Sequence, residues 1–104
     1  MPLELHWFLP SHGDGRDLAE PTRNGPRPAR VTRRPPEIGY LAQVARAADR
    51  LGFASVLTPA GLFCEDPWVV ASALAAQTER LKFMIALRPG LVSPTLVAQM
   101  AATL

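Results

Sequence analysis

The sequence predicts an α/β fold in which strands and helices alternate and the strands run parallel. Three short apolar segments, at 3–9, 53–57 and 81–87, are each followed by a loop and then by a segment with helical features. Such alternation is typical of a parallel sheet covered by helices, because a helix is the usual crossover between parallel strands. Right-handed crossovers then place the carboxyl ends of the three strands at one rim.

Strand–loop–helix units of this kind build the TIM (β/α)₈ barrel, which typically has about 250 residues. The chain has 104 residues and three such units. We therefore expect residues 1–104 to form a partial barrel, the N-terminal portion of an incomplete domain. In these barrels the loops after the strands carry the functional residues. The candidate site thus lies in the loops at 10–36, 58–65 and 88–93.

The first predicted strand, 3–9 (LELHWFL), has its leucines and Trp7 on one face, which assigns Trp7 to the core. The loop from 10 to 36 holds six of the eleven prolines and six of the arginines. Loops of this length are usually functional or lack fixed structure. We expect 16–36 to be a flexible Arg- and Pro-rich loop, and Asp14, between two glycines, to form a turn.

Residues 37–51 form the clearest predicted helix. Ile38, Leu41, Ala45 and Leu51 fall on one face at helical spacing, and Gly52 provides a stop signal. The following segment, FASVL at 53–57, is almost wholly apolar, as expected of a parallel strand that is buried on both faces.

Two further helices are predicted at 67–78 and 94–104. Asp66-Pro67 and Ser93-Pro94 each place a capping side chain directly before a proline. The cap accepts a hydrogen bond from a free amide, and proline at the first helical position loses no needed donor. Trp68, on the first of these helices, is assigned to the core.

Composition and charge argue against a nucleic-acid partner, a membrane span and a metal site. The net charge is +2, and the arginines responsible are concentrated in the loop at 10–36 without interleaved aromatic residues, so no nucleic-acid partner is expected. No apolar run approaches the roughly 20 residues of a membrane span. Cys64 is the one cysteine. It suits a reducing cytoplasm, and no spacing of histidine and cysteine predicts a metal site.

Two residues at the rim have side chains that can take part in chemistry. His12 follows the first strand and can bond a cofactor oxygen or transfer a proton; alternatively, it bonds its own backbone in a glycine-rich turn. Cys64 precedes a helix start, but adjacent carboxylates oppose activation of its thiol and no base accompanies it. Cys64 is therefore expected to line a pocket or to pack.

Three further rim residues are candidates for binding. Arg88 follows the third strand, where a guanidinium can bind a sulfonate or phosphate through paired hydrogen bonds; alternatively, it pairs with nearby acids or solvent. Thr58 and Leu87, at strand ends, either contact a flat cofactor ring or pack within the barrel. No GxGxxG or P-loop motif follows any strand.

Four segments carry a resemblance to a known family. They are WFLPSHGDG at 7–15, YLAQVARAADRLGFASVLTPAG at 40–61, CEDPWVVASAL at 64–74 and RLKFMIALRPGLVSPTLVAQMAATL at 80–104. In order and spacing, they resemble the N-terminal part of bacterial luciferase-like flavin monooxygenases, and within these the alkanesulfonate monooxygenase group. The resemblance covers nearly the whole chain apart from about 16–36.

The resemblance implies a (β/α)₈ barrel that uses reduced FMN and O₂ as co-substrates and no metal. A separate NAD(P)H-dependent flavin reductase would supply the reduced flavin, and an alkanesulfonate would be cleaved to an aldehyde and sulfite. His12 matches the family's active-site loop histidine and Cys64 a cysteine near the flavin. Thr58, Leu87 and Arg88 lie where flavin and substrate approach. The full-length parent is expected to be a homo-oligomer.

Two features of the sequence depart from the family pattern. The loop after Gly15 is unusually rich in Arg and Pro, so the match of Glu20 to a family acid is ambiguous. The chain also ends before the later rim loops, and the 104 residues alone are expected to be inactive. Two alternatives remain open: another luciferase-like monooxygenase with a different substrate, or a non-catalytic truncated or degenerate chain.

Overall fold

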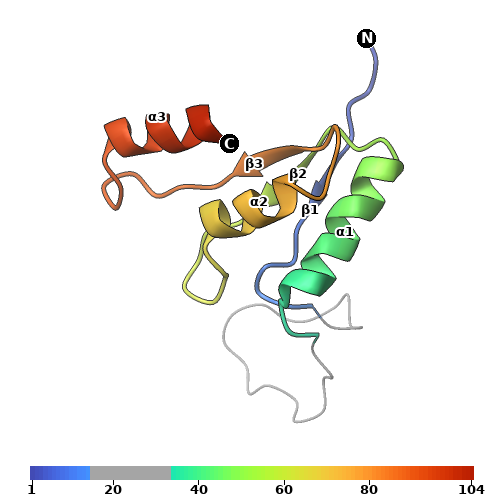
Figure 1. Ribbon diagram of the computed structural model, residues 1–104, viewed down its shortest axis with the longest axis horizontal. Coiled ribbons are helices and arrows are strands. Elements are labelled where there is room, and N and C mark those ends of the chain that lie inside the picture. Colours follow the sequence, from blue (N-terminus) through green and yellow to red (C-terminus); the bar gives the residue numbers. More distant parts are fainter. Residues whose placement is uncertain (15–33) are drawn as a thin grey trace.

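The computed structural model describes residues 1–14 and 34–104 and confirms an α/β fold with alternating strands and helices (Figure 1). Most of the predicted loop at 16–36 lies outside the described residues. The elements in chain order are β1 (His6–Phe8), α1 (Ile38–Arg50), β2 (Ser55–Thr58), α2 (Pro67–Ala75), β3 (Lys82–Ile85) and α3 (Pro94–Thr103).

The three strands form one parallel sheet in the order β1-β2-β3. Trp7 of β1 is level with Val56 of β2, which is level with Phe83 of β3. The strands are shorter than predicted. The first begins at His6, although the Leu5 carbonyl still accepts from the Ala54 amide at 2.8 Å, and Leu3 is exposed. The architecture is that of the first three strand–helix units of a TIM barrel, as the sequence predicts.

One face of the sheet carries the hydrophobic core. Val56 points from the central strand into a cluster with Leu9, with Leu41 and Ala45 of α1, and with Leu74 of α2, all of which are buried. Both helices therefore pack on the same side of the sheet. Helix α3 has no buried residue and lies beyond β3, away from α1 (Figure 1).

The opposite face presents the alternate residues of each strand. Phe8, Leu57 and Met84 form one row across the sheet, and Phe8 and Met84 are exposed. Nearer the start of the strands, His6 Nδ1 lies 2.8 Å from the hydroxyl oxygen of buried Ser55. No described helix covers this face, which in a closed barrel is the interior side.

The predicted helix signals are confirmed. The carboxylate of Asp66 accepts from the Val69 amide at 2.9 Å, and the Ser93 hydroxyl accepts from the Leu96 amide at 3.2 Å. Gly52 follows α1 with φ of 83°, a left-handed conformation that favours glycine. Within the described residues, no helix is long and apolar enough to cross a membrane.

The predicted burial was wrong at several aromatic and helical positions. Trp7 is 54% exposed and packs edge-on against Phe53, while Trp68 is partly buried. Ile38 and Leu51, at the two ends of the predicted apolar face, are also exposed. Ile38 is the first residue of α1 and Leu51 follows its last, and at helix ends a spacing pattern cannot distinguish contact from exposure.

Asp49 is buried at the end of α1. Its carboxylate accepts from the backbone amides of Glu79, at 2.7 Å, and of Arg80, at 3.2 Å. These bonds hold the turn between α2 and β3 against α1. The amide of Glu79 is the main cause that lowers the pKa of Asp49, and burial opposes it.

We predict that Asp49→Asn lowers the midpoint of thermal unfolding at pH 7, because an amide oxygen accepts these bonds more weakly than a carboxylate does. The lowered pKa of Asp49 means that its stabilisation is present above the unfolded pKa and is lost as pH falls through the folded value. The variant should therefore lose less stability than the parent between pH 7 and pH 3. Thermal unfolding followed by circular dichroism measures both effects.

Asp66→Asn is the matched control, because asparagine caps a helix about as well as aspartate does. Equal loss of stability in the two variants at pH 7 would contradict the role assigned to Asp49.

Candidate functional site

The loops that follow the three strands meet at one rim of the sheet. The Glu65 amide donates to the Ser11 carbonyl at 2.9 Å, which joins the loop after β1 to the loop after β2. Ser11 directly precedes His12, and Glu65 directly follows Cys64. A single backbone hydrogen bond therefore ties together the two segments that carry the predicted histidine and cysteine.

A cavity of about 400 Å³ lies between the loops after β2 and β3. This is a size typical of small-molecule sites. Cys64, Leu87 and Arg88 all line it, so the fold brings together three of the predicted site residues. Its other lining residues are Ala60, Gly61, Leu62, Glu65, Asp66, Pro67, Trp68, Ala86, Leu91 and Val92.

A tight turn positions the Cys64 thiol at this cavity. The Cys64 amide donates to the Gly61 carbonyl at 3.1 Å, and a side chain added at Gly61 would meet the Cys64 sulfur at 3.3 Å. Cys64 is neither fully buried nor fully exposed, which is consistent with a residue that lines a pocket.

His12 lies at the same rim but does not line this cavity. Its side chain is exposed, and its ring packs edge-on against the ring of Phe8 with 5.8 Å between centroids. Phe8 belongs to the sheet face that no described helix covers. His12 is therefore placed beside the opening of that face rather than beside Arg88.

Thr58 and Ser11 have fully buried hydroxyls that lack a hydrogen-bond partner among the described residues. Thr58 shares a strand face with Val56, so its side chain points toward the helices. This orientation supports the packing alternative that the sequence left open. Contact of Thr58 with a cofactor stays a prediction.

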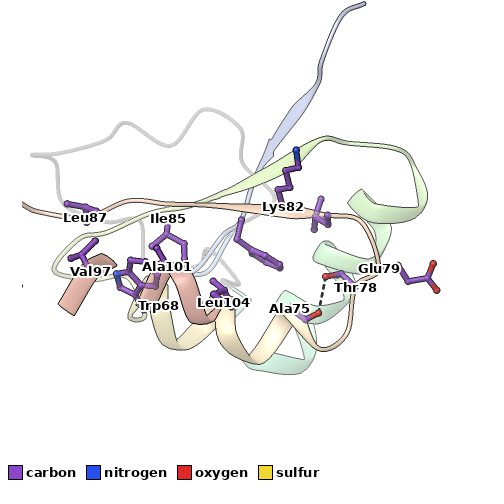
Figure 2. Close-up of a pocket in the computed structure, with 12 residues that line it drawn as sticks. Trp68, Ala75, Thr78, Glu79, Lys82, Ile85, Leu87, Val97, Ala101 and Leu104 are labelled. Carbon is purple, nitrogen blue, oxygen red and sulfur yellow. Dashed lines mark hydrogen bonds between the residues drawn. The ribbon is translucent and has the colours of Figure 1, made fainter. Parts of the chain in front are cut away.

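A larger cavity of about 590 Å³ lies on the helix side of the sheet (Figure 2). Neither His12 nor Cys64 lines it. Figure 2 shows Ile85 and Leu87 on one side of it and Trp68, Val97 and Ala101 on the other. It lies between β3 and α3, and its walls are mainly apolar. Trp68 and Leu87 line both cavities, so the two adjoin at the end of β3.

A polar cluster next to His12 was missed from the sequence. The Tyr40 hydroxyl donates to the Asp14 carboxylate, and the Arg34 guanidinium lies 5.3 Å from the centre of the Tyr40 ring. Burial, and then the bond to Asp14, raise the pKa of the Tyr40 hydroxyl, so it remains a donor at neutral pH. Asp14 was expected only to form a turn; its partners are 20 and 26 residues away, where spacing carries no signal.

Comparison with protein families matches residues 3–104 to the luciferase-like monooxygenases. The chain belongs to this family. Its members generally depend on a flavin, which agrees with the resemblance found in the sequence and with the parallel strand–helix fold. Among the residues that the structure describes, no group of three or more histidine, cysteine, aspartate or glutamate side chains is arranged to hold a metal ion.

The residues at the rim fit a flavin in their chemistry. A flavin ring is flat and largely apolar, and the rim cavity has apolar walls at Leu87, Leu91 and Val92. Its charged lining residues are Arg88 and the carboxylates Glu65 and Asp66, of which Asp66 caps α2. The alkyl and aromatic groups suit the ring faces, and the guanidinium suits an anionic group.

The position after His12 gives a direct test of the rim geometry. Gly13 has φ of 81°, and a side chain added there would lie 2.6 Å from the Arg34 carbonyl oxygen. We predict that Gly13→Ala costs more than the roughly 1–2 kcal/mol expected from a left-handed backbone alone, because a backbone atom blocks the added methyl group. Urea unfolding measures the change.

Substitutions at two other glycines distinguish the cost of the left-handed backbone from the cost of the contact with the Arg34 carbonyl. Gly90 has φ of 90° but open space around it, so Gly90→Ala should show the backbone cost only. Gly39 in α1 has neither restriction, and alanine there should cause no loss. Equal effects at Gly13 and Gly90 would show that Arg34 does not lie against Gly13.

Proposed function

We propose that this chain forms part of the active site of an alkanesulfonate monooxygenase that uses reduced FMN and O₂. The observation that carries the proposal is the arginine at the rim cavity of a luciferase-like monooxygenase: Arg88 faces the same space as Cys64 and Leu87. A planar guanidinium binds oxyanions through paired hydrogen bonds. A sulfonate, which keeps its negative charge at neutral pH, is a suitable ligand for it.

Each rim residue has a distinct role in this proposal. Leu87 and Cys64 contact the flavin ring, and Thr58 lies behind them at the end of β2. Arg88 binds the sulfonate. His12 holds or transfers a proton at its imidazole, whose charge changes near neutral pH. When bound, reduced FMN would supply two electrons to O₂, so that one oxygen atom is added to the carbon that bears the sulfonate and the other leaves as water. The products would be an aldehyde, sulfite, oxidised FMN and water.

The proposal includes partners outside this chain. Reduced flavin must be regenerated, so a separate NAD(P)H-dependent flavin reductase supplies it. The cytoplasm, where NAD(P)H is available and Cys64 stays reduced, is the proposed location. The active protein is proposed to be a homo-oligomer.

We predict that the chain binds reduced FMN in the micromolar range under anaerobic conditions and then binds a medium-chain alkanesulfonate. Arg88→Ala should weaken sulfonate binding about 10- to 100-fold, the equivalent of the roughly 1.5–3 kcal/mol lost with a hydrogen bond to a charged group. Isothermal titration calorimetry measures both steps.

Arg46→Ala is the control for net charge, because Arg46 lies on α1 and bonds Gln77 at 3.0 Å, away from the rim. An alkyl carboxylate of matched length tests the head group. Flavin binding with no preference for the sulfonate would favour a luciferase-like enzyme with another substrate. No flavin binding at millimolar concentration would contradict a role for these rim residues in holding the flavin.

A further inference from the structure

The backbone around His12 is held on both sides, while its own side chain is exposed. On the preceding side, Ser11 is fully buried and its carbonyl accepts from Glu65. On the following side, Gly13 is buried against the Arg34 carbonyl. An exposed imidazole between two buried, hydrogen-bonded neighbours is the arrangement expected of a pre-organised functional side chain.

One polar cluster lies on the C-terminal side of His12. It consists of Asp14, Arg34 and Tyr40. Asp14 and Arg34 exchange backbone hydrogen bonds, at 3.2 Å and 2.7 Å, in an isolated antiparallel bridge. The Asp14 carboxylate also accepts from the Tyr40 hydroxyl, and Arg34 stacks on the Tyr40 ring. Tyr40 lies in the first turn of α1, and α1 contributes Leu41 and Ala45 to the hydrophobic core.

We propose that this Asp14–Arg34–Tyr40 clasp is a positioning device that holds His12 over Phe8 at the rim. The clasp transmits the fixed position of α1 to the backbone two residues after His12. Its bonds are charge-assisted and include a cation–π contact, both of which are stronger than neutral surface contacts. The relevance of this position to catalysis rests on the function proposed for His12, but the position itself does not.

The sequence provides an internal reference for the test. It contains two histidines, His12 beside Phe8 and His6 beside Ser55, at opposite ends of the same sheet face. In NMR spectra of the full chain, the parent should show a nuclear Overhauser effect between the His12 and Phe8 rings. Tyr40→Phe removes the donor to Asp14 but keeps the ring beneath Arg34.

The expected result is loss of the His12–Phe8 cross-peak in Tyr40→Phe, with His6 unchanged. Asp14→Ala should lose it as well, whereas Asp14→Asn, which keeps an oxygen acceptor for Tyr40, should retain it. An unchanged cross-peak in Tyr40→Phe overturns the proposal. Shifts of both histidines together also overturn it, because they assign the cluster to overall stability instead.

The measurement needs no flavin and no turnover. Loss of the cross-peak together with absent flavin binding would leave the clasp standing and remove the proposed function. Flavin binding by the parent chain, with an unchanged cross-peak in Tyr40→Phe, would overturn the clasp and leave the proposed function standing.

Discussion

Parallel pairing of β1, β2 and β3 is the constraint on which the rest of the structure depends. In a parallel sheet every strand delivers its carboxyl end to the same edge, so segments far apart in sequence must meet there. The shared edge explains why the Glu65 amide reaches the Ser11 carbonyl and why Cys64 and Arg88 line one cavity. It also separates the two faces: alternate residues go either to the core around Val56 or to the open row at Phe8, Leu57 and Met84.

The candidate site residues at the rim lie on two different sides of the sheet. Cys64, Leu87 and Arg88 gather on the side of the α2 start, whereas His12 stands over Phe8 on the open face. A ligand that uses all four must therefore extend across the strand ends rather than sit in one enclosed cavity. A flavin with a second, anionic substrate beside it has such an extended shape.

Local signals predicted the elements well, because their causes lie within a few residues. Asp66 and Ser93 cap their helices, and Gly52 ends α1, each through bonds or backbone angles set by immediate neighbours. The sequence also predicted that the loops carrying Cys64 and Arg88 would lie at one rim, since the hand of the crossovers follows a general rule. It did not predict the burial of Asp49 or the bond from Tyr40 to Asp14, whose partners come from distant segments. Trp7 was placed in the core wrongly because alternation shows which face a side chain takes, not whether a helix covers it.

Convergence of the strand ends on one rim can be measured directly because the chain has a single cysteine. A nitroxide spin label on Cys64 broadens the NMR signals of nuclei near it. The structure predicts strong broadening for the ring of His12 and for the backbone amides of Ala86 and Leu91. It predicts weaker broadening for His6 and Ala54, which lie at the other end of the sheet. Broadening of His6 and Ala54 with His12 unaffected would contradict a common rim, and with it the flavin site proposed for these loops.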